Sequence, residues 1–257
     1  MPRLRSVPSI IEQRGDLIVE RDPARPSGRL LRQGKMDASY VDLADPSHLE
    51  FDYMRWMRIV VRAARARRVL HVGGGACALA RALAADDPDG RQEVCEIDPA
   101  VLKIAREHLG LRRAPGLRVR EADGRQFLAA QEGSSWDAVV IDAYVGASVP
   151  RRLVTVEALA DVGRVAPLAM VNVVDDRSAR MIRGVAAGLA VAYPRVWALG
   201  GRGSNTLVVA SASELDLDRV SARAAADPSP ARLTGPGEMA RLVQSAEPLH
   251  DGRGEAD

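Results

Sequence analysis

The sequence predicts an α/β fold in which a mostly parallel sheet ends in an antiparallel hairpin. The first observation is an apolar strand over 69–72 that runs into three glycines, 73–75, and then into an alanine-rich helical segment, 76–85. The second is that strand-like and helix-like segments continue to alternate along the chain. The third is a pair of apolar segments, 196–199 and 206–210, whose short glycine-rich connection predicts a closing hairpin at the sheet edge.

Residues 1–44 are expected to form a small N-terminal β-hairpin appendage. Strand-like segments alternate there with turns rich in Pro and Gly, and these segments are 16–20, 29–31 and 38–43. A helix is expected to start next, with Asp45 as its cap and Pro46 at its first helical position. Apolar side chains then recur at helical spacing, and Tyr53 and Trp56 on that stripe are interpreted as core residues.

Residues 45–212 are expected to form the main α/β domain. Its parallel strands are predicted over 69–72, 93–97, 117–121, 137–141 and 168–174. The unbroken apolar run of the last strand is typical of a strand that helices cover on both faces. Five parallel strands followed by a hairpin are the order of a Rossmann-like class I methyltransferase sheet. Residues 213–257 show little periodicity and are expected to form a partly flexible C-terminal extension.

Four features fall at the ends of these strands: the glycine run 73–75, Glu96, Asp123 and Asp142. Because the carboxyl ends of parallel strands meet at one edge, we expect them to line a single crevice. Glycines let the backbone approach a ligand, and a carboxylate placed like Glu96 can accept hydrogen bonds from two ribose hydroxyls. Three acids favour an adenine nucleoside with a cationic sulfonium over a dinucleotide, whose pyrophosphate is anionic. An NAD-dependent oxidoreductase is the more distant alternative.

Composition narrows the class of protein further. The net charge is only +2 and aromatic residues make up 4%, so no nucleic-acid partner is predicted. No apolar run is long enough to cross a bilayer, which predicts no membrane partner and a cytoplasmic location. Cys77 and Cys95 are expected to be inert buried thiols. His71 is interpreted as a core residue, and the spacing of histidines and cysteines predicts no metal site.

With these residues placed, the chain resembles the spermidine synthase (polyamine aminopropyltransferase) family over most of its length. The likeness rests on the glycine loop, Glu96-Ile97-Asp98-Pro99, Asp123-Gly124 and Asp142. It extends to the strand-like segment 39–43, the helix 49–56 and the turn 201–205.

The resemblance implies a role for each position in the crevice. Gly73, Gly74 and Gly75 would face the methionine-derived part of the cofactor, Glu96 would hold the ribose with Ile97 also on the cofactor side, Asp123 and Gly124 would lie at the adenine, and Asp142 would be the base for the attacking amine. The cofactor would be decarboxylated S-adenosylmethionine or S-adenosylmethionine, used in polyamine biosynthesis by a homodimer. Tyr144, two residues beyond Asp142, is a further candidate, because its hydroxyl or ring can meet a cationic centre in the same crevice.

The departures from the family pattern fall on the acceptor side. Where family members read Gly-Gly-Gly-Asp-Gly, this chain has Ala76 and Cys77 after the glycines. Where they read Asp-x-x-Asp-Pro, Val145 stands in place of the second aspartate, and Ala38 replaces a glutamine. A buried ammonium without a carboxylate partner costs several kcal/mol, so putrescine is not the expected acceptor.

The predicted function is therefore a transferase that moves an aminopropyl group to a small-molecule amine other than putrescine. S-Adenosylmethionine-dependent methyl transfer is one alternative, and a non-catalytic nucleoside-binding or scaffold protein of the same fold is another. Asp175 and Asp176 lie at the correct edge to supply a substitute carboxylate, although a helix cap is the preferred interpretation of both.

Overall fold

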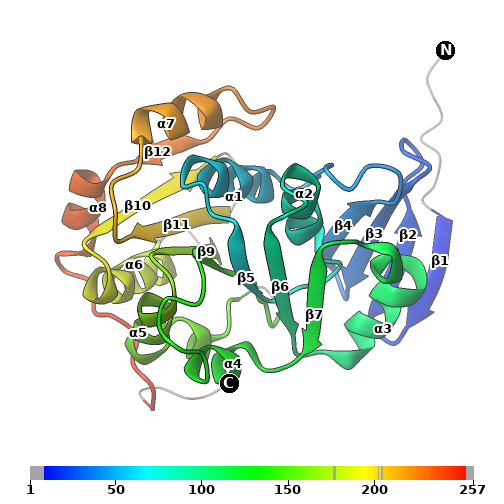
Figure 1. Cartoon of the computed structure of the whole chain (residues 1–257), viewed down its shortest axis with the longest axis horizontal. Coiled ribbons are helices and arrows are strands. Elements are labelled where there is room, and N and C mark those ends of the chain that lie inside the picture. The colour runs from blue at the N-terminus through cyan, green and yellow to red at the C-terminus, as the bar shows by residue number, and fades with distance from the viewer. Residues whose placement is uncertain (1–8, 147, 176–177, 202, 204, 253–257) are drawn as a thin grey trace.

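The computed structural model describes residues 9–146, 148–175, 178–201, 203 and 205–252 (Figure 1). The N-terminal part is an antiparallel sheet in the order β1-β2-β3-β4, with bounds Ser9–Arg14, Leu17–Arg21, Gly28–Gln33 and Met36–Asp42. The predicted hairpin appendage is thus a four-stranded sheet. Its inner side chains, among them Val19 and Leu31, are fully buried in the same core as the helices next to it.

The main sheet has eight strands in the order β12-β10-β11-β9-β8-β5-β6-β7. Their bounds are Arg68–Val72 (β5), Arg91–Glu96 (β6), Leu117–Glu121 (β7), Ala138–Ile141 (β8), Leu168–Val174 (β9), Arg195–Gly200 (β10), Asn205–Ser211 (β11) and Arg232–Thr234 (β12). The pairs among β7, β6, β5, β8 and β9 are parallel, whereas β11, β10 and β12 pair antiparallel. The predicted fold class, a mostly parallel sheet that ends in an antiparallel hairpin, is confirmed.

Helices cover both faces of this sheet. One buried cluster includes residues of α1 (Asp52–Ala63), α2 (Ala78–Asp86), α3 (Pro99–His108) and α7 (Leu217–Ala225). The other includes residues of α4 (Gly124–Ala129), α5 (Val156–Val165), α6 (Arg180–Ala192) and α8 (Pro236–Val243). Short 3-10 turns at Leu111–Arg113 and Arg151–Leu153 complete the helical elements. Strand residues alternate between the clusters, as Val69 and Leu70 do on β5, because successive side chains point to opposite faces.

The predicted helix start at Asp45 is wrong. The helix α1 begins at Asp52, and its cap residue Phe51 makes no side-chain capping bond. Asp45 instead accepts hydrogen bonds from the backbone and hydroxyl of Ser47, which closes a local turn. A side chain that bonds its own backbone two residues on stabilises a turn as readily as a helix cap, and the sequence pattern alone does not separate the two.

The C-terminal segment contains more regular structure than its weak periodicity indicated. The helices α7 and α8 bury few apolar side chains, chiefly Val220 and Met239, so their sequences show little pattern. The strand β12 pairs with β10 and joins the main sheet. Beyond α8, the backbone oxygen of Leu249 accepts a hydrogen bond from Val156 at the start of α5. Tertiary contacts rather than local propensity place this segment.

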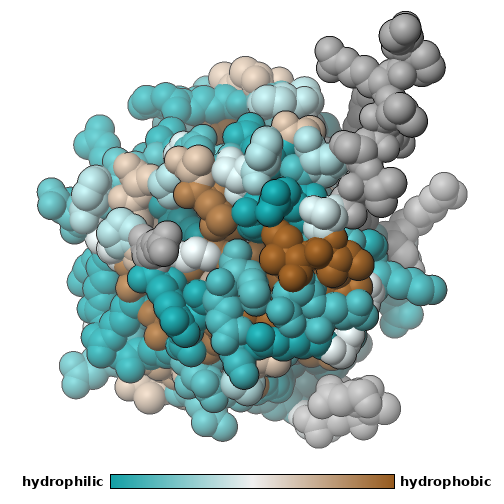
Figure 2. All heavy atoms as spheres, turned by 90° about the vertical axis from the view of Figure 1, so that its right-hand side faces the viewer, coloured by the Kyte–Doolittle hydropathy of each residue, from teal (hydrophilic) through white to brown (hydrophobic). Residues whose placement is uncertain are grey.

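Within the described ranges, no helix is both long and apolar enough to span a membrane. The two cysteines are buried and free, and they belong to different clusters, Cys77 to the first and Cys95 to the second. His71 is buried and bonded to Gln92, and burial lowers its pKa to about 4. The side of the molecule in Figure 2 is mostly hydrophilic, with hydrophobic residues exposed near its middle.

Candidate active site

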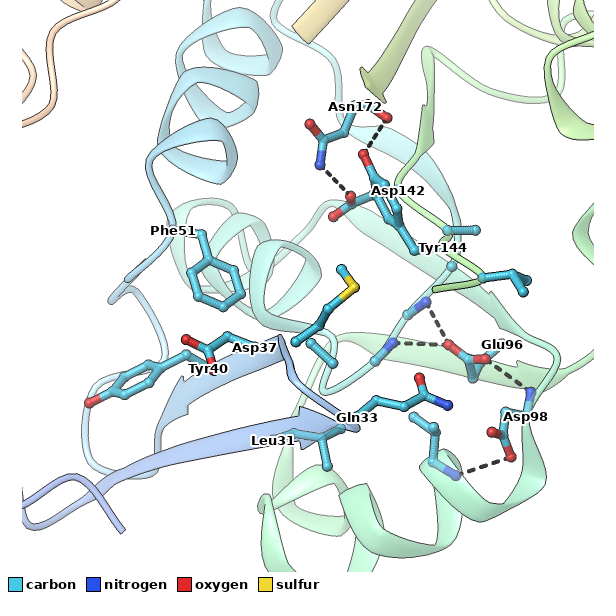
Figure 3. A pocket seen from close by; sticks show the side chains of 18 of the residues that line it. Leu31, Gln33, Asp37, Tyr40, Phe51, Glu96, Asp98, Asp142, Tyr144 and Asn172 are labelled. Carbon is cyan, nitrogen blue, oxygen red and sulfur yellow. Dashed lines mark hydrogen bonds between the residues drawn. The ribbon is translucent and has the colours of Figure 1, made fainter. Parts of the chain in front are cut away.

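A cavity of about 1350 Å³ lies between the carboxyl edge of the main sheet and the N-terminal sheet (Figure 3). Its lining includes eight of the nine predicted site residues: Gly73, Gly74, Gly75, Glu96, Ile97, Gly124, Asp142 and Tyr144. Asp123 does not line it, although its neighbours Ala122 and Gly124 do. The wall also includes residues of β3, β4 and α1, which come from outside the predicted crevice.

The glycine loop follows β5 and leaves no room for larger residues. A Cβ on Gly73 would lie 2.4 Å from the backbone oxygen of Asp142, and its φ of +89° is one that side chains rarely adopt. A Cβ on Gly74 would lie 2.6 Å from the side chain of Val94. The run of glycines therefore lets three backbone segments meet at the edge of the cavity.

Glu96, at the end of β6, holds this loop with its carboxylate. Its Oε2 accepts hydrogen bonds from the backbone nitrogens of Gly74 at 2.9 Å and Gly75 at 3.0 Å. Its Oε1 accepts one from the backbone nitrogen of Asp98 at 2.9 Å. A carboxylate offers about four acceptor positions, so one remains, on Oε1, for a ligand hydroxyl. Asp98 in turn caps α3 by accepting hydrogen bonds from the backbone nitrogens of Ala100 and Val101.

Both carboxylate oxygens of Asp123 are already engaged by other protein groups. Its Oδ1 caps α4 by accepting from the backbone of Arg125 and Gln126, and its Oδ2 pairs with Arg152 at 2.6 Å. Burial alone would raise its pKa, but the ion pair with Arg152 and the backbone donors hold the pKa below its usual value. Gly124 permits close packing, because a Cβ there would lie 2.4 Å from the side chain of Val72. The adenine-side role of Asp123 stays a prediction.

Asp142 follows β8 and is the chemically distinctive carboxyl group of the cavity. Burial raises its pKa to about 6, although the Asn172 amide and the Tyr53 hydroxyl oppose that rise by hydrogen bonding. The Nδ2 of Asn172 donates to its Oδ1 at 2.9 Å (Figure 3). Tyr144 donates its hydroxyl to the backbone oxygen of Asn172 at 2.8 Å, so that hydroxyl is already engaged while the residue lines the cavity. A carboxyl group with a pKa near neutrality is suited to proton transfer.

The sequence interpretation missed three residues at this end of the cavity: Tyr53, Asn172 and Asn205. Tyr53 packs against the core, as expected, but it also lines the cavity, where its hydroxyl helps to lower the pKa of Asp142. Asn172 is a single polar residue inside the apolar run of β9, and that interruption is a signal that points to a polar partner. Asn205 follows the glycine-rich turn and offers no such signal.

The departures at positions 76 and 145 have a structural counterpart. Ala76 is fully buried, and its backbone nitrogen donates to the Oγ of Ser39 on β4 at 3.1 Å, so the N-terminal sheet occupies the space beside the loop. Val145 lines the cavity and is 75% exposed.

Asp175 accepts a hydrogen bond from the backbone of Ile182 in the first turn of α6, which agrees with a capping role. Asp176, Arg202 and Ser204 lie outside the described residues.

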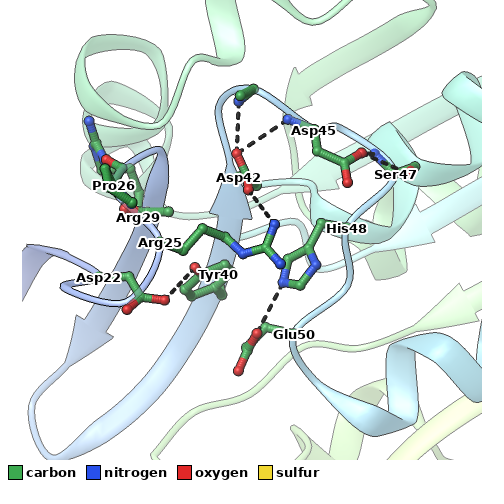
Figure 4. A network of polar contacts seen from close by, with 12 residues as sticks. Asp22, Arg25, Pro26, Arg29, Tyr40, Asp42, Asp45, Ser47, His48 and Glu50 are labelled. Atoms are coloured by element: carbon green, nitrogen blue, oxygen red, sulfur yellow. Dashed lines mark hydrogen bonds and ion pairs between the residues drawn. The ribbon is translucent and has the colours of Figure 1, made fainter. Parts of the chain in front are cut away.

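The N-terminal wall of the cavity is fixed by a polar network (Figure 4). Tyr40 donates its hydroxyl to Asp22 at 2.7 Å, and Arg25 pairs with Asp42 at 2.8 Å. Burial alone would raise the pKa of Asp42, but Arg25 and nearby backbone donors hold that pKa far below its usual value. Both Tyr40 and Asp22 line the cavity, so this network sets the shape of its far side.

Acidic side chains outnumber basic ones along the described lining. The nine acids are Asp16, Glu20, Asp22, Asp37, Glu50, Asp52, Glu96, Asp98 and Asp142, and the three basic residues are Arg21, Lys35 and Arg152. A cavity with this imbalance favours cationic ligands over anionic ones.

Comparisons with known proteins agree with this geometry. No protein-family model matches the sequence. A polyamine aminopropyltransferase of Vibrio vulnificus (strain CMCP6) is 32% identical over 94 residues, which are 36% of this chain and 31% of the relative. A probable spermidine synthase from Corynebacterium glutamicum ATCC 13032 has 25% identity and a TM-score of 0.86, with 98% of this chain and 99% of that chain covered. The likeness to spermidine synthases is confirmed.

Two further structures extend the spermidine synthase-like comparison at the level of the fold. A spermidine synthase in complex with the transition state analogue AdoDATO has a TM-score of 0.66 and 15% identity, over 91% of this chain and 85% of that one. Human methyltransferase-like protein 13 in complex with SAH has a TM-score of 0.56 and 16% identity, over 79% and 97%. The named relatives are enzymes, in line with the predicted class of protein. The match to the curated relative spans about a third of that protein's length.

Proposed function

We propose that this chain is a transferase that binds an adenosyl-sulfonium cofactor and moves an aminopropyl group to an amine acceptor. The observation that carries the proposal is Asp142, a half-buried carboxyl group that lines the same cavity as the glycine loop and Glu96. In the proposed reaction, its carboxylate takes the proton that the acceptor amine loses. The likeness to a probable spermidine synthase over nearly the whole chain supports this assignment.

The residues of the cavity fit such a cofactor. The close-packed glycine loop brings backbone to the cavity edge, and Glu96 retains one acceptor position for a ribose hydroxyl. Ile97 is 57% exposed and offers an apolar surface on the same wall. The acidic surplus suits a sulfonium cation. Ligand cavities are commonly about 300–1,000 Å³, so 1350 Å³ leaves room for an acceptor beside the nucleoside.

The cofactor, when bound, supplies an alkyl carbon activated by a cationic sulfur that departs as a neutral thioether. The chain has to supply orientation and a base, since an ammonium has no free electron pair with which to attack. Asp142 accepts that proton, while the amide of Asn172 holds its carboxylate in place and the Tyr53 hydroxyl helps to stabilise its charge. A pKa of about 6 leaves most of the carboxyl group ionised at pH 7 and still basic enough to work.

The proposed acceptor is a small-molecule amine other than putrescine. Ala76 and Val145 leave the distal ammonium of a diamine without the carboxylates expected at those positions. Because Ser39 fills the space beside Ala76, the neighbouring side chain does not replace the missing acid. Action as a homodimer in the cytoplasm belongs to the same proposal.

Methyl transfer from S-adenosylmethionine is the second candidate. Position 76 offers no carboxylate for a terminal amine, which removes one reason for the chain to prefer the decarboxylated cofactor. The likeness in fold to a methyltransferase-like protein in complex with SAH supports this alternative.

Isothermal titration calorimetry with four compounds tests the cofactor class. We expect micromolar binding of S-adenosylmethionine, its decarboxylated form and methylthioadenosine, and no binding of NAD. Transfer to a panel of amines is then followed by mass spectrometry with each donor, with putrescine expected among the poorest acceptors. Binding of NAD alone would overturn the cofactor assignment. Putrescine turnover on the order of 1–10³ per second would overturn the acceptor assignment.

A further inference from the structure

The chain contains only two asparagines, Asn172 and Asn205, and both line the cavity. Asn172 lies within β9 and is 1% exposed, whereas Asn205 is the first residue of the adjacent strand β11. The Nδ2 of Asn205 donates to the Oδ1 of Asn172 at 3.1 Å. The Nδ2 of Asn172 then donates to the Oδ1 of Asp142 at 2.9 Å. The two amides thus form a hydrogen-bond chain across β11 and β9 to the end of β8.

The orientation of the two amides in this hydrogen-bond chain matters for Asp142. A primary amide has a donor end and an acceptor end, and rotation by about 180° exchanges them. In the opposite orientation, Asn172 would present its oxygen to the Asp142 carboxylate, and two acceptors would face each other. The amide of Asn205 binds the oxygen of Asn172 and so selects the orientation in which Asn172 donates.

We propose that Asn205 is a positioning residue for Asp142, acting through Asn172 to hold the carboxylate in the orientation that faces the cavity. The role of this hydrogen-bond chain in catalysis rests on the proposed function. The hydrogen-bond chain itself can be tested without an acceptor or a cofactor, because the state of the Asp142 carboxyl group is measurable directly.

Other titratable groups lie around Asp142 and are the same in every variant described below. Tyr53 meets it from α1, and Tyr144 lies two residues further along the same connection. His71 on β5 shares with Asp142 the lining of a second small cavity behind the glycine loop. Burial lowers the pKa of His71 to about 4, so this histidine is neutral in the range where Asp142 titrates.

Carbon-13 NMR of the intact protein with labelled aspartate carboxyl groups tests the proposal by pH titration. The Asp142 signal is assigned by its absence in Asp142→Asn. The Asn172→Leu variant removes the amide at similar size and is expected to lower the acid dissociation constant of Asp142 about tenfold, because a hydrogen bond to the charged form is lost. Asn205→Ala is expected to shift it in the same direction by a smaller factor. Thr206→Val, next to Asn205 on β11, is the matched control and is expected to leave it unchanged.

The double variant Asn172→Leu/Asn205→Ala decides whether Asn205 acts through Asn172. If it does, the double variant titrates like Asn172→Leu alone, since the second change has nothing left to orient. Additive shifts, or an unchanged titration in Asn205→Ala, would overturn the proposal. Asn205→Ser, whose side chain is too short to reach Asn172, provides a second readout if Asn205→Ala fails to fold. A non-additive shift in a protein that transfers nothing to any amine would count against the proposed function and leave the positioning role intact.

Discussion

The two ends of the cavity are assembled in different ways. At the end proposed for the nucleoside (the nucleoside end), Glu96 and the backbone groups that it binds all lie within residues 73–98. At the end proposed for the base (the base end), Asn172 donates to Asp142 and is itself held from Asn205, while the Tyr53 hydroxyl helps to lower the pKa of Asp142. The first end is a local motif that the chain builds over one strand–helix–strand unit. The second depends on four elements that only the fold brings together.

The two key carboxylates differ accordingly. Glu96 accepts three backbone hydrogen bonds and so has a structural task even before a ligand arrives. Asp142 is half-buried in the cavity wall and accepts a hydrogen bond from the Asn172 amide, and desolvation raises its pKa to about 6. The comparison separates a carboxylate that shapes the site from one that is poised to exchange a proton. Each prediction below breaks or sharpens that distinction.

The largest effect is expected from Asp142→Asn. The amide keeps the shape of the carboxyl group and loses its basicity, so transfer is expected to fall about 10²–10⁴-fold, the range for a lost general base. Nucleoside affinity is expected to stay within about tenfold, because Asp142 belongs to the other end of the cavity. Steady-state rates and calorimetry on the same preparation measure both quantities. Equal transfer by the variant and the wild type would make Asp142 a structural acid.

A smaller effect is expected from Glu96→Ala, and it has two parts. Loss of a hydrogen bond to a charged group costs about 1.5–3 kcal/mol, so nucleoside affinity is expected to fall roughly 10- to 150-fold. Because the variant also leaves the nitrogens of Gly74 and Gly75 without their acceptor, the melting temperature is expected to fall as well. Glu121→Ala, at the register-paired position on β7, is the control and changes neither quantity. If affinity weakens while the melting temperature stays unchanged, Glu96 does not stabilise the glycine loop.

The pH dependence of transfer is expected to follow Asp142. With a pKa of about 6, its carboxyl group is protonated and inactive as a base at lower pH, so kcat/KM is expected to rise with pH and level off above that value. Below the pKa the loss approaches tenfold per pH unit. Rates measured from pH 4.5 to 8.5 at constant ionic strength check this. A profile that stays flat down to pH 5 would contradict a base with this pKa.

The difference between the two ends of the cavity also explains how much of the site could be predicted from the sequence. The parallel strands, the closing hairpin and the glycine loop followed from local patterns, and eight of the nine predicted site residues line the cavity. Asp123 was expected in the crevice because it ends a predicted strand, but its oxygens bond to the start of α4 and to Arg152, a partner 29 residues away. Tyr53 has the spacing of a core residue because the helical stripe continues into the cavity wall. Hydrophobic periodicity indicates which face of a helix turns away from solvent, but not whether core side chains or a cavity lie against that face.

The smallest effect is expected from Tyr53→Phe, which tests whether the missed helix residue belongs to the base end. The change removes only the hydroxyl that opposes the raised pKa of Asp142, and that contribution is smaller than the one from Asn172. The pKa of Asp142 should therefore rise by less than in Asn172→Leu, and the pH limb of transfer should move up by under about one unit. Transfer then falls about two- to threefold at pH 6 and less at pH 8, where the carboxyl group is ionised in both proteins.

Tyr193→Phe removes another tyrosine hydroxyl, one that donates to the backbone oxygen of Ala166 in the core. This control is expected to lower stability and leave the pH limb in place. If Tyr53→Phe behaves in the same way, Tyr53 is a core residue after all, and the carboxylate of Asp142 is held from the sheet alone.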